Sequence, residues 1–94
     1  MILHKVSTSP FTEQSLQQCL KRIQRADKLL LIQDAVYAII KTDMTDTLLM
    51  RAPIYVLIDD LQARGLTIQS ELFQAISYPE FVALTLECNQ VISW

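Results

Sequence analysis

The pattern of apolar and polar positions predicts strands and helices in regular alternation. Residues 12–26 are predicted to form an amphipathic helix, because their apolar positions follow the i, i+3, i+4, i+7 spacing: Leu16, Cys19, Leu20 and Ile23. Residues 28–33 form a nearly continuous apolar run with no alternation. A run of this kind is typical of a strand covered on both faces, as in a parallel sheet.

The same reasoning assigns the other elements. Apolar runs predict further strands at 1–6, 53–58 and 72–77, and a terminal strand or docked tail at 91–94. Helical segments are predicted at 35–41 and 61–64, with a final helix from Tyr78 onward and a loop and helical extension at 42–47 and 48–50. Proline near the start of the final helix suits a first helical turn. Gly65 fits the left-handed position that ends a helix.

Strands that alternate with helices through short connections predict a parallel sheet. We therefore expect an α/β fold in which residues 1–94 form one three-layer domain. It would contain a mostly parallel five-stranded sheet with helices on both faces. The length agrees, because 94 residues suffice for one hydrophobic core and no more.

Composition and charge exclude several classes of protein. Hydrophobic residues make up 51% and charged residues 19%, which excludes a disordered chain. No apolar run reaches the length of a membrane span, and a cytoplasmic protein with reduced thiols is the default expectation. The net charge is −2, the pI is about 5.1 and the basic residues are scattered. Direct binding to nucleic acid is therefore not expected.

Most catalytic and cofactor motifs are absent from the sequence. A single glycine cannot build a Gly-rich phosphate loop, and one histidine with no Cys-x-x-Cys pair argues against a transition-metal site. His4, in the first strand, is more simply a sheet residue than a catalytic base. We expect no metal, no cofactor and no reaction run by this chain alone.

Acidic residues follow two of the predicted strands. Asp34 lies at the carboxyl end of the 28–33 strand, where ligands bind in open α/β sheets, and is a weak ligand-binding candidate. It could equally cap the following helix. Asp59 and Asp60 could hold a cation or cap the helix at 61–64.

The two cysteines are the remaining reactive residues. Cys88 shares an apolar helix face with Phe81 and Leu84, so we predict that it packs in the core. Cys19 lies at the edge of its apolar stripe, and Arg22 three residues later could favour a thiolate. The residue chemistry alone favours a packing role for Cys19 as well.

Several separated segments resemble the TusB/DsrH family, in order and over nearly the whole chain. They are LHKVSTSPF at 3–11, LLLIQDAVYA at 29–38, APIYVL at 52–57, DLQARGL at 60–66, YPEFVALT at 78–85, and the closing Trp94. The chain departs from the family pattern at Ala35, which stands where a glycine is usual. If that glycine serves a positive φ elsewhere, the turn here must differ.

The resemblance implies an accessory, non-catalytic subunit of a sulfur relay. In such a relay, TusB-, TusC- and TusD-like α/β subunits form a heterohexamer with two copies of each. It receives persulfide sulfur that begins at a cysteine desulfurase and passes it to a TusE-like acceptor, on the way to 2-thiolation of the tRNA wobble uridine. The persulfide cysteine is usually assigned to the TusD-like subunit. In the DsrH branch a cysteine occupies the helix position of Cys19, which makes Cys19 a candidate persulfide acceptor.

Three alternatives stay open at the level of sequence. The chain could be a DsrH-type subunit of a DsrEFH complex in sulfur oxidation. It could be a small-ligand-binding α/β module that uses Asp34 and Asp59, or a homo-oligomeric interaction module. A mean hydropathy of +0.26 is high for a small monomer and predicts an apolar surface patch for partners.

Overall fold

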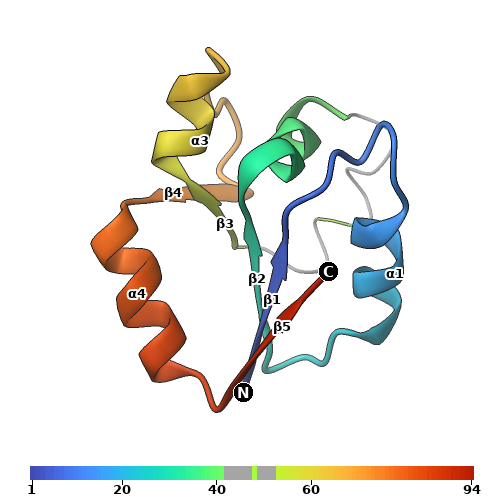
Figure 1. Cartoon of the computed structure of the whole chain (residues 1–94), viewed down its shortest axis with the longest axis vertical. Coiled ribbons are helices and arrows are strands. Elements are labelled where there is room, and N and C mark those ends of the chain that lie inside the picture. The colour runs from blue at the N-terminus through green and yellow to red at the C-terminus, as the bar shows by residue number, and fades with distance from the viewer. Residues whose placement is uncertain (42–47, 49–52) are drawn as a thin grey trace.

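The computed structural model describes residues 1–41, 48 and 53–94. Its strands are β1 (Ile2–Val6), β2 (Lys28–Leu31), β3 (Ile54–Leu57), β4 (Phe73–Ile76) and β5 (Gln90–Ser93). Its helices are α1 (Ser15–Arg22), the 3-10 helix η1 (Gln33–Ile40), α3 (Ile58–Ala63) and α4 (Tyr78–Glu87). Strands and helices alternate along the chain, as the sequence predicts (Figure 1).

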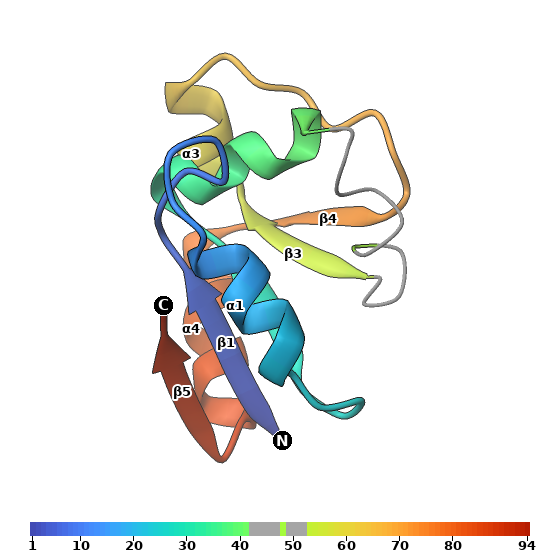
Figure 2. The ribbon, with the colours of Figure 1, turned by 90° about the vertical axis from the view of Figure 1, so that its right-hand side faces the viewer.

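The five strands form one sheet in the order β4-β3-β2-β1-β5, and every neighbouring pair is parallel. From β1 to β4 the chain steps across the sheet in one direction, and α4 then carries it back to place β5 beside β1. Right-handed crossovers put the helices of the first three steps on one face and α4 on the other. Figure 2 shows this arrangement, with α1 in front of the sheet and α4 behind it. The predicted α/β class is confirmed.

Two apolar clusters fill the space between sheet and helices. Successive residues of a strand point to opposite faces, so Leu29 and Leu31 join the larger cluster and Leu30 joins the smaller one. The larger cluster packs α1, η1 and α3 against the sheet, and it includes Leu48. The smaller cluster packs α4 against the sheet and consists of Leu3, Leu30, Ile76 and Leu84.

Helix α1 is shorter than the predicted helix at 12–26. Its helical conformation ends at Ile23, where ψ is 136°. The carboxylate of Asp27 accepts the Gln24 N–H at 3.0 Å, so this amide no longer bonds to the preceding helical turn. The Asp27 side chain, which lies just beyond the predicted helix, thus takes the place of the last turn's backbone acceptor, and α1 ends early.

Two further boundaries differ from the prediction. Helix α3 begins at Ile58, so Asp59 and Asp60 lie inside its first turn instead of capping it. Residues 35–41 were predicted as a short helix, which is observed as the 3-10 helix η1. The expectations for 42–47 and 48–50 lie outside the described residues, Leu48 excepted.

The remaining boundary signals are confirmed. Gly65 has φ +63° directly after α3, where only glycine adopts this conformation without strain. Ser77 and Glu80 form a reciprocal capping box at the start of α4. The segment at 91–94 is a strand, β5, followed by Trp94. Among the described helices, none has the length and apolar character needed to cross a membrane.

Candidate functional site

Acidic residues and an arginine meet at the carboxyl ends of β2 and β3. Arg64, at the end of α3, donates from Nε and Nη2 to Oδ1 of Asp34 at 3.0 and 2.9 Å. Its Nη1 donates to the backbone oxygen of Asp60 at 3.1 Å. Oδ2 of Asp60 accepts the backbone N–H of Gln33 at 2.7 Å. The parallel sheet therefore brings Asp34 and Asp60 into one cluster, because adjacent parallel strands end at the same edge.

The cluster stabilises a strained turn. Gln33 has φ +48°, the left-handed region that a side chain makes costly, and among the described residues no other non-glycine has a positive φ. The short hydrogen bond from Gln33 to Asp60 holds this turn as the chain leaves β2. Ala35 lies two residues later, fully buried, and does not need the conformational freedom of glycine. The backbone strain therefore lies at Gln33 and not at Ala35, the residue that departs from the family pattern.

The carboxylates at this edge already have internal partners. Asp34 is paired with Arg64, although its side chain is 59% exposed. Asp59 is exposed on the first turn of α3. Within 1–41, 48 and 53–94, no group of three His, Cys, Asp or Glu residues could hold a metal ion. The arrangement thus accounts for Asp34 and Asp60 as structural residues, and ligand binding by Asp34 stays a prediction.

Cys19 lies inside the larger apolar cluster. Helix α1 turns this side chain toward the sheet, where it is fully buried together with Leu16 and Leu29. A persulfide acceptor must present its thiolate to the sulfur donor. Sulfur transfer to Cys19 would therefore require α1 to move away from the sheet.

Cys88 closes the carboxyl end of α4 and packs partly against the smaller cluster. The sequence predicts a core position for Cys88, and this is met only in part, because the residue packs against the cluster but remains partly exposed. Burial raises the pKa of the Cys88 thiol, and the nearby Lys28 ammonium does not offset this effect. A raised pKa lowers the thiolate fraction near neutral pH, so Cys88 is poorly suited to attack a persulfide.

His4 is buried and uses both ring nitrogens. Its Nδ1 lies 3.1 Å from the indole Nε1 of Trp94, and its Nε2 lies 2.9 Å from Oδ2 of Asp27. An indole N–H only donates, so Nδ1 must accept and the imidazole proton must sit on Nε2, which donates to Asp27. With both nitrogens engaged, His4 has none available as a catalytic base. This agrees with the prediction of a sheet residue.

Asp27 ties together three parts of the chain. Besides the His4 contact, its carboxylate accepts backbone N–H groups from Ile2 at 3.1 Å and Gln24 at 3.0 Å. Burial by itself would raise the pKa of Asp27. The hydrogen bonds from His4, Gln24 and Ile2 outweigh burial and hold the pKa below its usual value. No sequence motif identifies Asp27. Its role depends on the loop after α1, which brings its carboxylate to Ile2 and His4 of β1.

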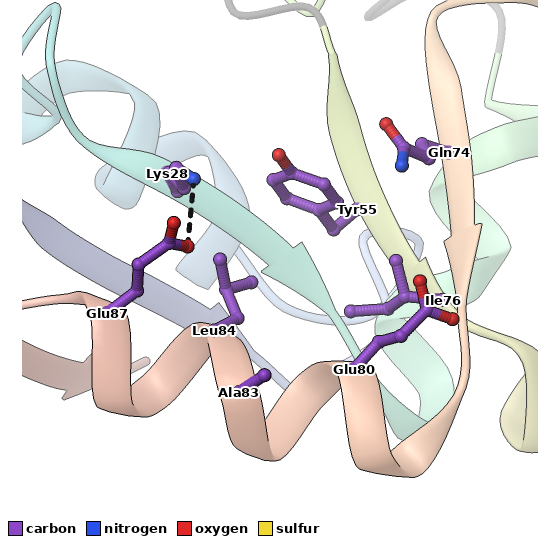
Figure 3. Close-up of a pocket in the computed structure, with 8 residues that line it drawn as sticks. All are labelled: Lys28, Tyr55, Gln74, Ile76, Glu80, Ala83, Leu84 and Glu87. Carbon is purple, nitrogen blue, oxygen red and sulfur yellow. Dashed lines mark hydrogen bonds and ion pairs between the residues drawn. The ribbon is translucent and has the colours of Figure 1, made fainter.

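A pocket of about 340 Å³ opens between α4 and the sheet (Figure 3). Lys28, Tyr55 and Gln74 line it from three neighbouring strands, and Glu80 and Glu87 line it from the helix. Lys28 Nζ lies 3.4 Å from Oε2 of Glu87 and 5.7 Å from the centre of the Tyr55 ring. Burial lowers the pKa of Lys28, but Tyr55 and Glu87 outweigh it and raise the pKa above its ordinary value. The pocket therefore keeps Lys28 charged.

Comparison with known proteins assigns this α/β chain to a family. Residues 8–91 match the family described as "DsrH like protein", and the chain belongs to that family. Curated relatives carry the name Protein TusB. The protein from Yersinia pestis is 41% identical over 96 positions that span 99% of this chain and 100% of the relative. Those from Yersinia pseudotuberculosis and Pectobacterium parmentieri are 41% and 40% identical over the same shares. The resemblance stated from the sequence is confirmed.

Proposed function

We propose that this chain is the TusB-like subunit of a sulfur-relay complex and that its role is mainly structural. The similarity to Protein TusB over essentially the full length of both chains carries this proposal. Its partners would be TusC-like and TusD-like subunits, two copies of each of the three, with a TusE-like protein as the sulfur acceptor of the complex. The final product would be the 2-thio group of the tRNA wobble uridine. A cytoplasmic location, where thiols stay reduced, suits this chemistry.

The environments of the two cysteines support a structural role over a carrier role. In persulfide transfer, an acceptor thiolate attacks the terminal sulfur of the donor persulfide. A new S–S bond forms, the old one breaks, and the donor leaves as a thiolate. Cys19 is buried and the thiol of Cys88 has a raised pKa, so neither presents an accessible thiolate. The reactive cysteine would then belong to a partner subunit, which this chain holds in place.

Two other versions share the same family. Cys19 would be a persulfide acceptor if assembly moves α1 and exposes the thiol. The complex would be DsrEFH-like and act in sulfur oxidation if its host lacks the tRNA thiolation partners. The description of the matching family as "DsrH like protein" is the observation that favours this DsrEFH-like version.

Removal of the gene and its replacement by variants test the proposal in the organism itself. The 2-thiouridine content of wobble-position tRNA would be measured by nucleoside mass spectrometry. We expect deletion to abolish the modification, and both the wild-type gene and a Cys19→Ala, Cys88→Ala double variant to restore it. Unchanged 2-thiouridine after deletion would contradict a role in tRNA thiolation. Restoration by the wild type but not by the double variant would contradict a purely structural role.

A further inference from the structure

The hydrogen bond between Trp94 and His4 is one that a single proton can break. The indole Nε1 of Trp94 donates to Nδ1 of His4 at 3.1 Å, and an indole has no acceptor to offer in return. The bond therefore exists only while Nδ1 carries no proton. Imidazole is the side chain that gains a proton between about pH 5 and 8, and in the imidazolium both ring nitrogens are donors. Protonated His4 and Trp94 would then face each other with one N–H each.

The other nitrogen of His4 contacts a group that favours the charged ring. Nε2 lies 2.9 Å from Oδ2 of Asp27, and the side chains of His4 and Asp27 are only 4% and 5% exposed. Burial alone would raise the pKa of Asp27, but its hydrogen bonds outweigh burial and keep the pKa below its usual value, so the carboxylate stays ionised. A carboxylate this close stabilises an imidazolium more than a neutral imidazole. The ring thus binds Asp27 in both states and Trp94 in only one.

The strands and chain ends around His4 bring no second titrating group to the ring. β5 carries no ionisable side chain. Lys5 and Lys28 lie on the α4 side of the sheet, because side chains alternate along a strand and Lys28 lines the pocket under α4. The amino group of Met1 bonds to the residue that precedes β5. The carboxylate that follows Trp94 is ionised above about pH 4 and keeps its charge throughout.

Helix α1 and the segment after it contribute one charge to the ring, that of Asp27. The basic residues there are solvent-exposed: Lys21, Arg22 and Arg25. The thiol of Cys19 lies on the same side of the sheet, buried in the larger cluster, and a thiol ordinarily loses its proton only above about pH 8. Between about pH 5 and 8, a proton taken up at the contact between His4 and Trp94 therefore goes to His4.

The Trp94 contact holds one edge of the sheet. β5 pairs with β1 alone and forms the edge (Figure 2). Its own side chains are mostly exposed, so they bury little apolar surface. Trp94 follows β5 directly and packs against the larger cluster, and its backbone N–H donates to the Lys5 oxygen at 2.8 Å. Loss of the indole hydrogen bond therefore loosens the end of β5 and leaves the bonds at Asp27 in place.

We propose that His4 is a proton-operated latch on the end of β5: when Nδ1 takes up a proton from solvent, the Trp94 indole loses its acceptor and leaves the ring, while the Asp27 contact remains. The neutral ring holds the chain end on β1, and the charged ring releases it. Release exposes the indole and the last residues of β5 in mildly acidic solution. The proposal goes beyond the proposed function and does not depend on sulfur transfer.

NMR of the full chain tests the latch, because the sequence contains one histidine and one tryptophan and their signals are unambiguous. The His4 ring and the Trp94 indole N–H would be followed in one nitrogen-15-labelled sample from about pH 8 to about pH 5. We expect both signals to change with the same midpoint. Exchange of the indole proton with water, referenced to free tryptophan at each pH, should rise about tenfold or more as its hydrogen bond is lost. Circular dichroism should stay constant over this range, because the change is local.

Two substitutions should move the His4 midpoint in opposite directions, each by about threefold or more in proton affinity. Trp94→Phe removes the donor that stabilises the neutral ring, so the midpoint should rise. Asp27→Asn removes the charge that stabilises the imidazolium, so the midpoint should fall and the indole should be released at lower pH. Tyr78→Phe, at an exposed aromatic residue of α4, is the control and should leave the midpoint unchanged.

Three results would overturn the latch. The first is a pH series in which His4 gains its proton and the indole signal does not change, and the second is a ring that stays neutral down to about pH 5. The third is an unchanged midpoint in Trp94→Phe, because a bond that stabilises the neutral ring must affect its proton affinity. Loss of circular dichroism at the same midpoint would show global unfolding in place of local release and would equally contradict the proposal. None of these results bears on assembly or sulfur transfer, so the proposed function is tested separately.

Discussion

Trp94, the last residue of the chain, donates its indole N–H to Nδ1 of His4 across 90 residues of sequence. The two rings stack with their centres 6.1 Å apart. Because β5 is a four-residue edge strand with mostly exposed side chains, few other side-chain contacts hold it on β1. The contact between His4 and Trp94 therefore holds β5 beside β1 and sets the tautomer of a buried histidine.

Replacement of Trp94 by phenylalanine tests this contact. The variant keeps an aromatic ring but leaves Nδ1 of His4 buried without its donor. We expect the free energy of unfolding to fall by about 1–3 kcal/mol, the cost of an unsatisfied buried polar group. Urea unfolding followed by circular dichroism measures the change. Tyr78→Phe, which removes an exposed hydroxyl, is the control, and equal stability of the Trp94 and Tyr78 variants would contradict the account.

The lowered pKa of Asp27 predicts how the free energy of unfolding depends on pH. Its folded pKa lies below the unfolded value of about 3.9, so its contribution is fully present above the unfolded pKa and is lost as pH falls through the folded pKa. Stability should therefore fall below about pH 5 in the wild type and less steeply in Asp27→Asn. Urea unfolding between neutral and acidic pH measures both slopes. Parallel curves for the wild type and Asp27→Asn would show that Asp27 does not supply this dependence.

Two glycine substitutions near the end of β2 should have opposite effects. Gln33→Gly relieves a left-handed residue and should stabilise the fold by about 1 kcal/mol. Ala35→Gly adds backbone freedom within η1 and removes a buried methyl group, so it should destabilise the fold by about 1 kcal/mol. Thermal and urea unfolding of both variants measure the difference. Destabilisation by Gln33→Gly would mean that its side chain outweighs the strain.

The edge cluster should depend on Asp60 more than on Asp34. Loss of the Asp60 carboxylate in Asp60→Ala removes the acceptor of the Gln33 N–H and should cost about 1–3 kcal/mol. Asp34→Ala breaks an exposed ion pair with Arg64, and such pairs contribute about 0–1 kcal/mol. Urea unfolding compares the two variants. Thermal-shift assays of the wild type with nucleotides test the remaining ligand-binding hypothesis, and a shift that Asp34→Ala abolishes would make Asp34 a ligand-binding residue.

The two cysteines should differ in reactivity toward a thiol reagent. Cys88 is partly exposed and should react slowly in the native protein, in keeping with its raised thiol pKa. Cys19 should react only when the protein unfolds, because α1 covers it. Alkylation with iodoacetamide, followed by peptide mass spectrometry with and without urea, measures both rates. Labelling of native Cys19 as fast as Cys88 would show that α1 opens readily.

The sequence predicted the order of elements because each depends on local signals. The alternation of apolar runs, Gly65 after α3 and proline at the start of α4 are all visible in the residues themselves. The network around His4 could not be predicted, because it joins Ile2, Asp27 and Trp94, which only the sheet order brings together. The same holds for the hydrogen bond from the Gln33 N–H to the Asp60 carboxylate, since nothing in the residue type of Gln33 signals a positive φ.

The length of α1 likewise depends on a contact that the local sequence pattern does not reveal. The apolar spacing through Ile23 favoured a longer helix, but Asp27 takes the Gln24 amide and ends it. Cys19 was placed correctly on the apolar stripe, while its complete burial depended on how closely α1 packs on the sheet. Periodicity indicates which side of a helix faces the core, and tertiary packing decides how accessible a single thiol is.

The proposed role of this chain is to support sulfur transfer without carrying sulfur. Intact-protein mass spectrometry of the reconstituted complex, loaded from a cysteine desulfurase through the relay, tests it most directly, with Cys19→Ser as the matched control. We predict that the partner subunit gains the mass of sulfur, that this chain gains none, and that Cys19→Ser leaves loading of the partner unchanged. Added sulfur on the wild-type chain that is absent from Cys19→Ser would contradict the claim and make Cys19 a carrier.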